Sequence, residues 1–61
     1  MILRRVSDLT TVDNVRLEDR LWNVEAVTPA PIRYVELRLS RTSGEKVTLM
    51  LRPDDLILLA I

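Results

Sequence analysis

The stretch that decides the fold is Tyr34-Val-Glu-Leu-Arg-Leu-Ser-Arg-Thr-Ser-Gly-Glu-Lys-Val-Thr-Leu-Met-Leu-Arg52, in the second half of a chain of 61 residues. Apolar side chains alternate with polar ones on both sides of Gly44, the single glycine. They are Val35, Leu37 and Leu39 before it and Val47, Leu49 and Leu51 after it. Period-two alternation is typical of half-buried strands. The stretch therefore predicts an antiparallel hairpin.

The loop of this hairpin also predicts its register. A three-residue loop, Thr42 to Gly44, pairs Arg41 with Glu45 and sets every inward residue opposite another inward one. The expected inward pairs are Leu39 with Val47, Leu37 with Leu49, and Val35 with Leu51. The expected outward pairs are Tyr34 with Arg52, Glu36 with Met50, and Arg38 with Thr48. A two-residue Ser43-Gly44 turn would instead flip one strand, which a buried sheet disfavours.

Further strands are expected on both sides of the hairpin. Residues 15–17 and 21–27 read as strands joined by a turn at 18–20, and residues 2–6 as an edge strand. In 21–27 the side chains of Trp22, Val24 and Ala26 are expected to face inward, with a bend or bulge because Leu21 and Val27 lie at the ends. Two prolines in 28–31 predict an extended, rigid connection to the hairpin.

The two ends of the chain complete the expected fold. One helical turn is predicted from Ser7, since Ser7 and Asp8 are good caps. After a turn at 53–55, the apolar run 56–61 predicts a closing strand, with a short buried helix as the alternative. The whole chain, 1–61, is thus expected to be a single all-β domain, a small five-stranded SH3-like barrel or meander.

A resemblance to known proteins accompanies this pattern. Asp8-Leu9, Asp13, Val15, Arg20-Leu-Trp-Asn-Val24 and Val27 resemble the opening of small SH3-like barrel proteins of actinobacteria and their phages. The likeness covers about residues 7–61, and Val12 stands where these proteins usually have glycine. It implies a fold and a context, actinobacterial or phage, without implying an activity.

Composition argues against several functions. Nine basic residues balance nine acidic ones, so the broad positive field that attracts nucleic acid is absent. Without cysteine or histidine the chain lacks thiolate ligands, thiol nucleophiles and the commonest general base. Asp54-Asp55 reads as an ordinary turn. We therefore expect no enzyme activity, no cofactor and no bound metal.

The expected location follows from the same sequence. The longest apolar run, 56–61, is far shorter than the roughly 20 residues of a membrane span. The start, Met1-Ile-Leu-Arg-Arg5, lacks the charge-first order of a signal peptide. We expect a cytoplasmic protein with no membrane partner.

The outward face of the hairpin is the predicted partner-binding site. Tyr34, Arg38, Met50 and Arg52 lie on it, and Tyr, Arg and Met are enriched at protein interfaces. A solvated sheet face is the alternative interpretation. Trp22, the single tryptophan, is expected in the core, with a role as a partner contact left open.

The tail suggests self-association. A strand apolar on both faces needs cover on both sides, and a domain this small has little to cover the second side with. Ile57 and Leu59 are therefore predicted to form the self-association surface of a two-fold dimer. The alternative is that Ile2, Leu3 and Val6 cover this face within one chain.

The functional hypothesis is a non-catalytic protein-interaction module, a small phage accessory protein that binds a host or phage protein. One alternative is nucleic-acid binding, if Arg33, Arg38, Arg41 and Arg52 converge in space, although aromatic platforms are few. The other is a structural component of a virion or larger assembly.

Overall fold

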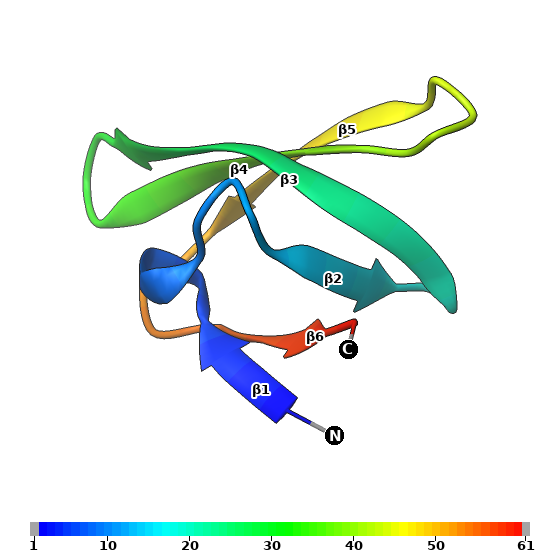
Figure 1. Ribbon diagram of the computed structural model, residues 1–61. Coiled ribbons are helices and arrows are strands. Elements are labelled where there is room, and N and C mark those ends of the chain that lie inside the picture. Colours follow the sequence, from blue (N-terminus) through cyan, green and yellow to red (C-terminus); the bar gives the residue numbers. More distant parts are fainter. Residues whose placement is uncertain (1, 61) are drawn as a thin grey trace.

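The computed structural model describes residues 2–60 as one antiparallel sheet with strand order β1-β6-β2-β3-β4-β5 (Figure 1). The elements are β1 Ile2–Arg5, the 3-10 turn η1 Val6–Asp8, β2 Asn14–Leu17, β3 Arg20–Ala30, β4 Tyr34–Ser40, β5 Lys46–Leu51 and β6 Leu56–Leu59. The all-β prediction is confirmed. All six segments expected as strands are present, with residues 2–5 forming the expected edge strand β1 along β6, so the predicted total of five strands is one too low.

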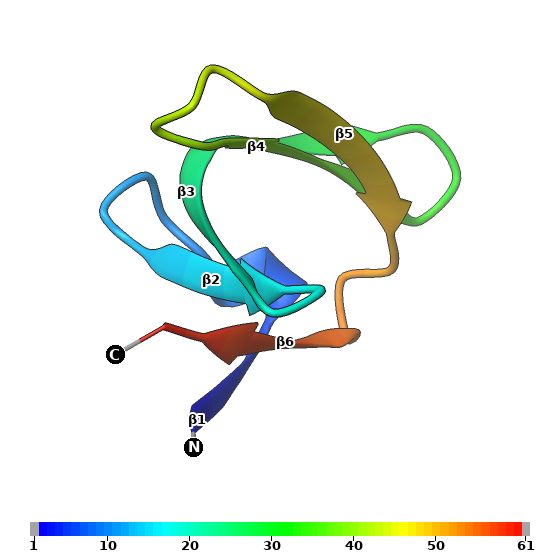
Figure 2. The ribbon, with the colours of Figure 1, turned by 90° about the vertical axis from the view of Figure 1, so that its right-hand side faces the viewer.

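The sheet curls because β3 serves two neighbours in turn. Its first residues, Arg20 to Asn23, pair with β2, and the stretch from Asn23 to Ala30 pairs with β4. Figure 2 shows the resulting curl, which sets β2 and β6 across from β4 and β5. Strands β1 and β5 are the two edges, so the sheet is open between them. The inward side chains of the two halves meet in the middle.

A β-bulge between Val24 and Ala26 corrects the predicted facing of β3. The bend was expected, but one extra residue shifts the alternation. Ala26 consequently pairs with Arg38 on the outward face, and Val27 pairs with Leu37 and packs against the core. The inward prediction for Ala26 is wrong for this reason.

The predicted connection at residues 28–31 is mostly strand. β3 continues in extended conformation to Ala30, with Pro29 opposite Val35. Proline is tolerated there because β2 ends its pairing at Asn23 and leaves that side of β3 as a free edge. The chain reverses only at residues 31–33.

The β4–β5 hairpin has the predicted register, with Leu39 opposite Val47, Leu37 opposite Leu49 and Val35 opposite Leu51. The three-residue loop is confirmed by two backbone hydrogen bonds of 2.9 Å. The Arg41 N–H donates to the Glu45 carbonyl, and the Gly44 N–H donates to the Arg41 carbonyl. Gly44 has φ +97°, a conformation that glycine adopts without strain.

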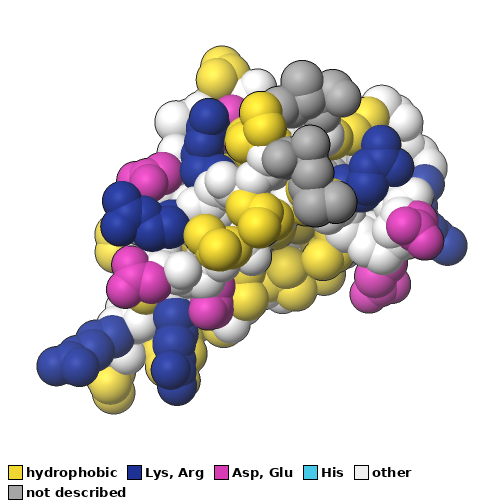
Figure 3. All heavy atoms as spheres, turned by 90° about the horizontal axis from the view of Figure 1, so that it is seen from below, with side chains coloured by type: hydrophobic (Ala, Val, Ile, Leu, Met, Phe, Trp, Pro, Cys, Tyr) yellow, Lys and Arg dark blue, Asp and Glu magenta, His cyan; other side chains and the backbone are white. Residues whose placement is uncertain are grey.

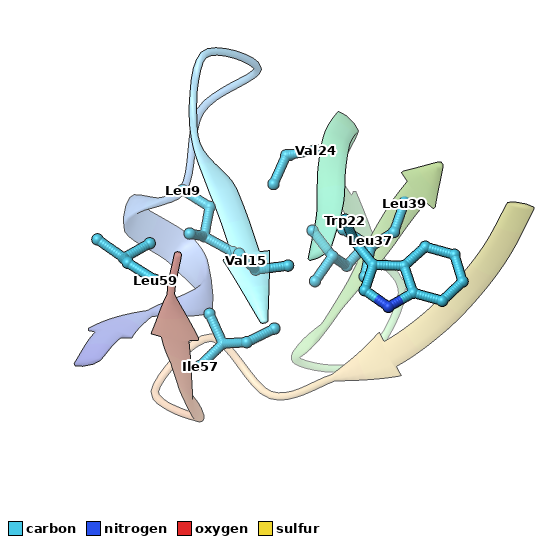
Figure 4. Packing of buried hydrophobic residues seen from close by; sticks show 8 residues of the cluster. All are labelled: Leu9, Val15, Trp22, Val24, Leu37, Leu39, Ile57 and Leu59. Carbon is cyan, nitrogen blue, oxygen red and sulfur yellow. The ribbon is translucent and has the colours of Figure 1, made fainter. Parts of the chain in front are cut away.

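The core lies inside the curl and draws its buried side chains from β2, β3, β4 and β6 and from Leu9, which follows η1, while β5 packs partly buried side chains against it (Figure 4). Its buried members are Leu9, Val15, Trp22, Val24, Leu37, Leu39, Ile57 and Leu59. Trp22 is a core residue, as expected, and its Nε1–H donates to the Leu17 carbonyl at 3.3 Å. The Arg41 guanidinium lies over its ring, 5.5 Å from the centroid.

Strand β6 corrects the predicted self-association surface. It lies between β1 and β2, so its inward side chains, Ile57 and Leu59, enter the chain's own core and are only 7% and 9% exposed. They are not available as a surface. Of the three residues of the alternative lid, Val6 is buried, but β1 pairs beside β6 rather than over it, which leaves Ile2 and Leu3 about half exposed. The last residue of the predicted strand, Ile61, lies outside the described residues.

Candidate protein-binding site

A shallow concavity of about 720 Å³ opens where the β3–β4 loop faces the turn between β5 and β6. Its lining residues are Ile32, Arg33, Tyr34, Arg52, Pro53, Asp54 and Asp55. One wall is the β3–β4 loop, residues 32–34, and the other is the β5–β6 turn, residues 52–55.

The β5–β6 turn is held by hydrogen bonds on two sides. Within the turn, the Arg52 N–H donates to the Asp55 carboxylate at 2.9 Å, and the Asp55 N–H donates to the Arg52 carbonyl at 3.1 Å. From η1, the Val6 N–H donates to the Asp55 carbonyl at 2.8 Å and the Ser7 N–H to the Pro53 carbonyl at 3.1 Å. This wall is therefore fixed to the body of the domain.

The β3–β4 loop is strained. Ile32 and Arg33 have φ of +62° and +67°, in the left-handed region that glycine and asparagine favour. A β-branched residue there is an outlier. Ile32 is nevertheless 86% exposed, so burial of its side chain within the chain does not offset the strain. Sequence reasoning missed Ile32, and the only hint was a tight reversal after Pro31 without glycine.

The charges around the concavity leave two arginines free. Among residues 2–60, the ion pairs include neither Arg33 nor Arg52. The Asp55 carboxylate accepts a hydrogen bond from the backbone of its own turn. Asp54 is 90% exposed and lies 3.9 Å from Arg5 Nη1. The guanidinium groups are thus open to an anionic group of a partner.

The structure places the predicted site residues along one side of the β4–β5 hairpin. Tyr34 and Arg52 line the concavity, and Met50 lies on the outward face opposite Glu36. Arg38 lies one outward position further along β4, and its Nε–H donates to Glu36 Oε1 at 2.8 Å. We call the set Ile32, Arg33, Tyr34, Arg38, Met50 and Arg52 the Tyr34 surface.

The four arginines of the nucleic-acid alternative do not converge. Arg33 and Arg52 share the concavity, and Arg38 is paired with Glu36. Arg41 lies at the opposite end of the hairpin, where it pairs with Glu45 and covers Trp22. Tyr34 is the one aromatic side chain in the concavity. A basic groove with stacking platforms is therefore not formed by these residues.

One carboxylate elsewhere has a shifted pKa. The Thr10 N–H donates to Asp13 Oδ2 at 2.8 Å, and Arg4 Nη1 lies 3.1 Å from Asp13 Oδ1. The hydrogen bond from Thr10, with Arg4 adding to it, holds the pKa of Asp13 below its usual value against the opposing effect of burial. This pair links β1 to the loop before β2 and serves the fold rather than the concavity.

Comparisons with known proteins do not extend this description. No protein-family model, no curated protein and no solved structure matches the chain. Within residues 2–60 no cluster of three or more acidic, histidine or cysteine side chains is arranged to hold a metal ion. In the same residues, no helix has the length and apolar character needed to cross a membrane.

Proposed function

We propose that this chain is a non-catalytic protein-interaction domain that binds a segment of a partner protein at the Tyr34 surface. The observation that carries the proposal is Ile32, an isoleucine held almost fully in solvent by a left-handed backbone. Such a conformation costs of order 1–3 kcal/mol, and strained residues of this kind cluster at binding sites. A partner that buries Ile32 offsets this cost.

The neighbouring side chains define the chemistry of that partner. Tyr34, 42% exposed, and Ile32 offer apolar contact on one side of the concavity. Arg33 and Arg52 offer guanidinium groups, which bind carboxylates through paired hydrogen bonds. The best-matched partner is a protein segment with an apolar side chain next to an aspartate or glutamate. Met50, 53% exposed, extends the contact along the hairpin.

The biological setting we propose follows the resemblance described above. It is a small cytoplasmic accessory protein, phage-encoded, that binds a host or phage protein. Binding of nucleic acid is less favoured, because the net charge is zero, Arg38 is paired with Glu36, and Arg41 lies at the opposite end of the hairpin from Arg33 and Arg52. A role inside a virion would use the same surface, with a virion protein as the partner.

Selection from a displayed random-peptide library tests the proposal. Peptides selected on the wild-type protein should combine an apolar residue with an acidic one and shift the NMR signals of residues 32–34 and 52. Tyr34→Ala and Arg52→Glu should each weaken binding by about tenfold or more, equivalent to about 1.4 kcal/mol. Arg16→Glu, on the opposite outward face, is the matched control and should bind normally.

Two results would overturn the proposal. One is that selected peptides bind Tyr34→Ala and Arg52→Glu as well as they bind the wild type. The other is tight, steeply salt-dependent binding of a single-stranded oligonucleotide in a fluorescence-anisotropy titration, since we expect affinity weaker than about 1 μM at physiological salt. The second result would make nucleic-acid binding the primary function.

A further inference from the structure

The half of the sheet opposite the Tyr34 surface has an apolar outward face. The pairing of β1, β6, β2 and β3 sets Leu3, Leu58, Arg16 and Leu21 in one row across these strands. Leu56 is the next outward residue along β6. Leu3, Leu21 and Leu56 are 54%, 54% and 60% exposed. We call these five residues the leucine face. Figure 3, which views the molecule from below, shows hydrophobic side chains gathered between charged ones at the margins.

No element of the described chain covers this face. A sheet that is apolar on both faces needs a layer packed on each. The inward face of β6 has the core against it, but residues 2–60 contain no α-helix that could form a second layer. The exposure of the three leucines shows that the outward face lacks such cover.

The dimensions of the face fit one helix better than a second copy of the domain. Four strands spaced about 4.8 Å apart span about 14 Å, and the four residues of β6 span about 13 Å. That is about 200 Å², well below the roughly 800 Å² per partner of a standard protein interface. An α-helix is about 10–12 Å wide with its side chains. One amphipathic helix therefore covers the face across its width.

The positive charge of Arg16 indicates that the covering helix must carry a negatively charged side chain. Its neighbours in the row, Leu58 and Leu21, are both apolar, and among residues 2–60 it has no ion-pair partner. A covering layer that removes water from an unpaired guanidinium is costly unless it supplies an anion. Two copies packed face to face would instead bring two such groups into one contact. A carboxylate on the covering layer resolves this.

We propose that the leucine face docks an amphipathic helix of a partner protein, with an aspartate or glutamate of that helix paired to Arg16. The face and the Tyr34 surface lie on opposite halves of the curled sheet, with β4 and β5 above and β1 and β6 below in Figure 1. The domain is then an adaptor that holds two protein segments at once. This inference stands on its own residues and does not depend on the Tyr34 surface.

A displayed library of amphipathic helices about three turns long tests it, with the positions of the apolar face randomised. Enriched helices should place an acidic residue among leucine-like ones and shift the NMR signals of Leu3, Arg16, Leu21 and Leu58. Arg16→Glu should weaken binding about tenfold or more, and a helix with the acid changed to lysine should recover binding to that variant. Arg33→Glu, in the concavity, is the control and should bind as the wild type does.

Four outcomes would overturn the inference: no enriched helices; helices without an acidic residue; binding unaffected by Arg16→Glu; or binding lost in Arg33→Glu. Two further measurements test other occupants. Analytical ultracentrifugation should show a monomer, and a dimer that Leu58→Asp dissociates would identify a second copy as the occupant. Flotation with vesicles of phosphatidylcholine and phosphatidylserine should show no binding, and Arg16-dependent binding would identify a membrane surface instead.

Discussion

In the β4–β5 half of the sheet the outward side chains are polar or charged except for Tyr34 and Met50. In the β1–β6–β2 half, by contrast, Leu3, Leu56 and Leu58 lie next to one another on the outward face. Both halves contribute their inward side chains to the same core. The β4–β5 half follows the usual rule for an antiparallel sheet with one face in water. The other half has more apolar side chains than its single core can bury. That surplus is the reason to expect a partner on the leucine face.

The largest expected effect is a difference in the free energy of unfolding between variants of two neighbouring residues of β6. Ile57 is buried and Leu58 faces outward. Ile57→Ala should lower the free energy of unfolding by about 2–5 kcal/mol, because it empties space in the core. Leu58→Ala should cost less than Ile57→Ala, because Leu58 is only half-buried and its outer side is open to water. Urea unfolding measures both.

An equal cost for the two variants would break the comparison, because it would mean that the outward face is covered in solution. Repeating the unfolding at several protein concentrations identifies the cover. A midpoint that rises with concentration in the wild type but not in Leu58→Ala would indicate self-association through β6.

The second prediction compares the β4–β5 loop with the β3–β4 loop, in which single substitutions should change stability by about 1 kcal/mol in opposite directions. Gly44 and Ile32 both have positive φ. Gly44→Ala should lower stability by about 1 kcal/mol through backbone strain alone, since an added Cβ meets nothing within 4 Å. Ile32→Asn should raise stability by up to about 1 kcal/mol, because asparagine tolerates this conformation.

The same Ile32→Asn variant should lose affinity for peptides selected on the Tyr34 surface. Thermal unfolding by circular dichroism and a peptide titration together provide the test. An Ile32→Asn variant that is less stable than the wild type would show that the loop stores no strain, which would remove the main support for the Tyr34 surface.

The smallest effect concerns the loop before β2, where the Asp13 carboxylate accepts a hydrogen bond from the Thr10 N–H and pairs with Arg4 of β1. Because the pKa of Asp13 is lowered in the folded protein, its ionised form favours folding. The contribution is fully present above the ordinary value of 3.8 and is lost as the pH falls through the lower folded value. Asp13→Asn should therefore reduce stability at neutral pH and flatten the acid side of the stability curve.

The measurement is urea unfolding at a series of pH values from neutral to below 3.8, the ordinary pKa of an aspartate side chain. Asp19→Asn is the matched control: Asp19 lies in the β2–β3 turn at φ +62°, which asparagine tolerates, and it has no ion pair among residues 2–60. If both variants change the acid side equally, the contacts of the Asp13 carboxylate with Thr10 and Arg4 do not stabilise the folded protein.

Local pattern was enough to predict the β4–β5 hairpin to the residue. Alternation of apolar and polar side chains and a glycine suited to the loop act over a few residues, so Leu37 opposite Leu49 follows from the sequence by itself. The same holds for the turn before β6 and for the core position of Trp22. Of the candidate site, the sequence predicted Tyr34 and Arg52 as outward residues of that hairpin.

Only the tertiary structure decided how the remaining strands use their two faces. A bulge of one residue moved Val27 inward and Ala26 outward, and the pairing of β6 between β1 and β2 placed Ile57 and Leu59 in the core. A run that is apolar at every position has no alternation to indicate its inward side. Its facing depends on which distant strands pair with it, and so does the meeting of Ile32, Tyr34 and Arg52 around one concavity.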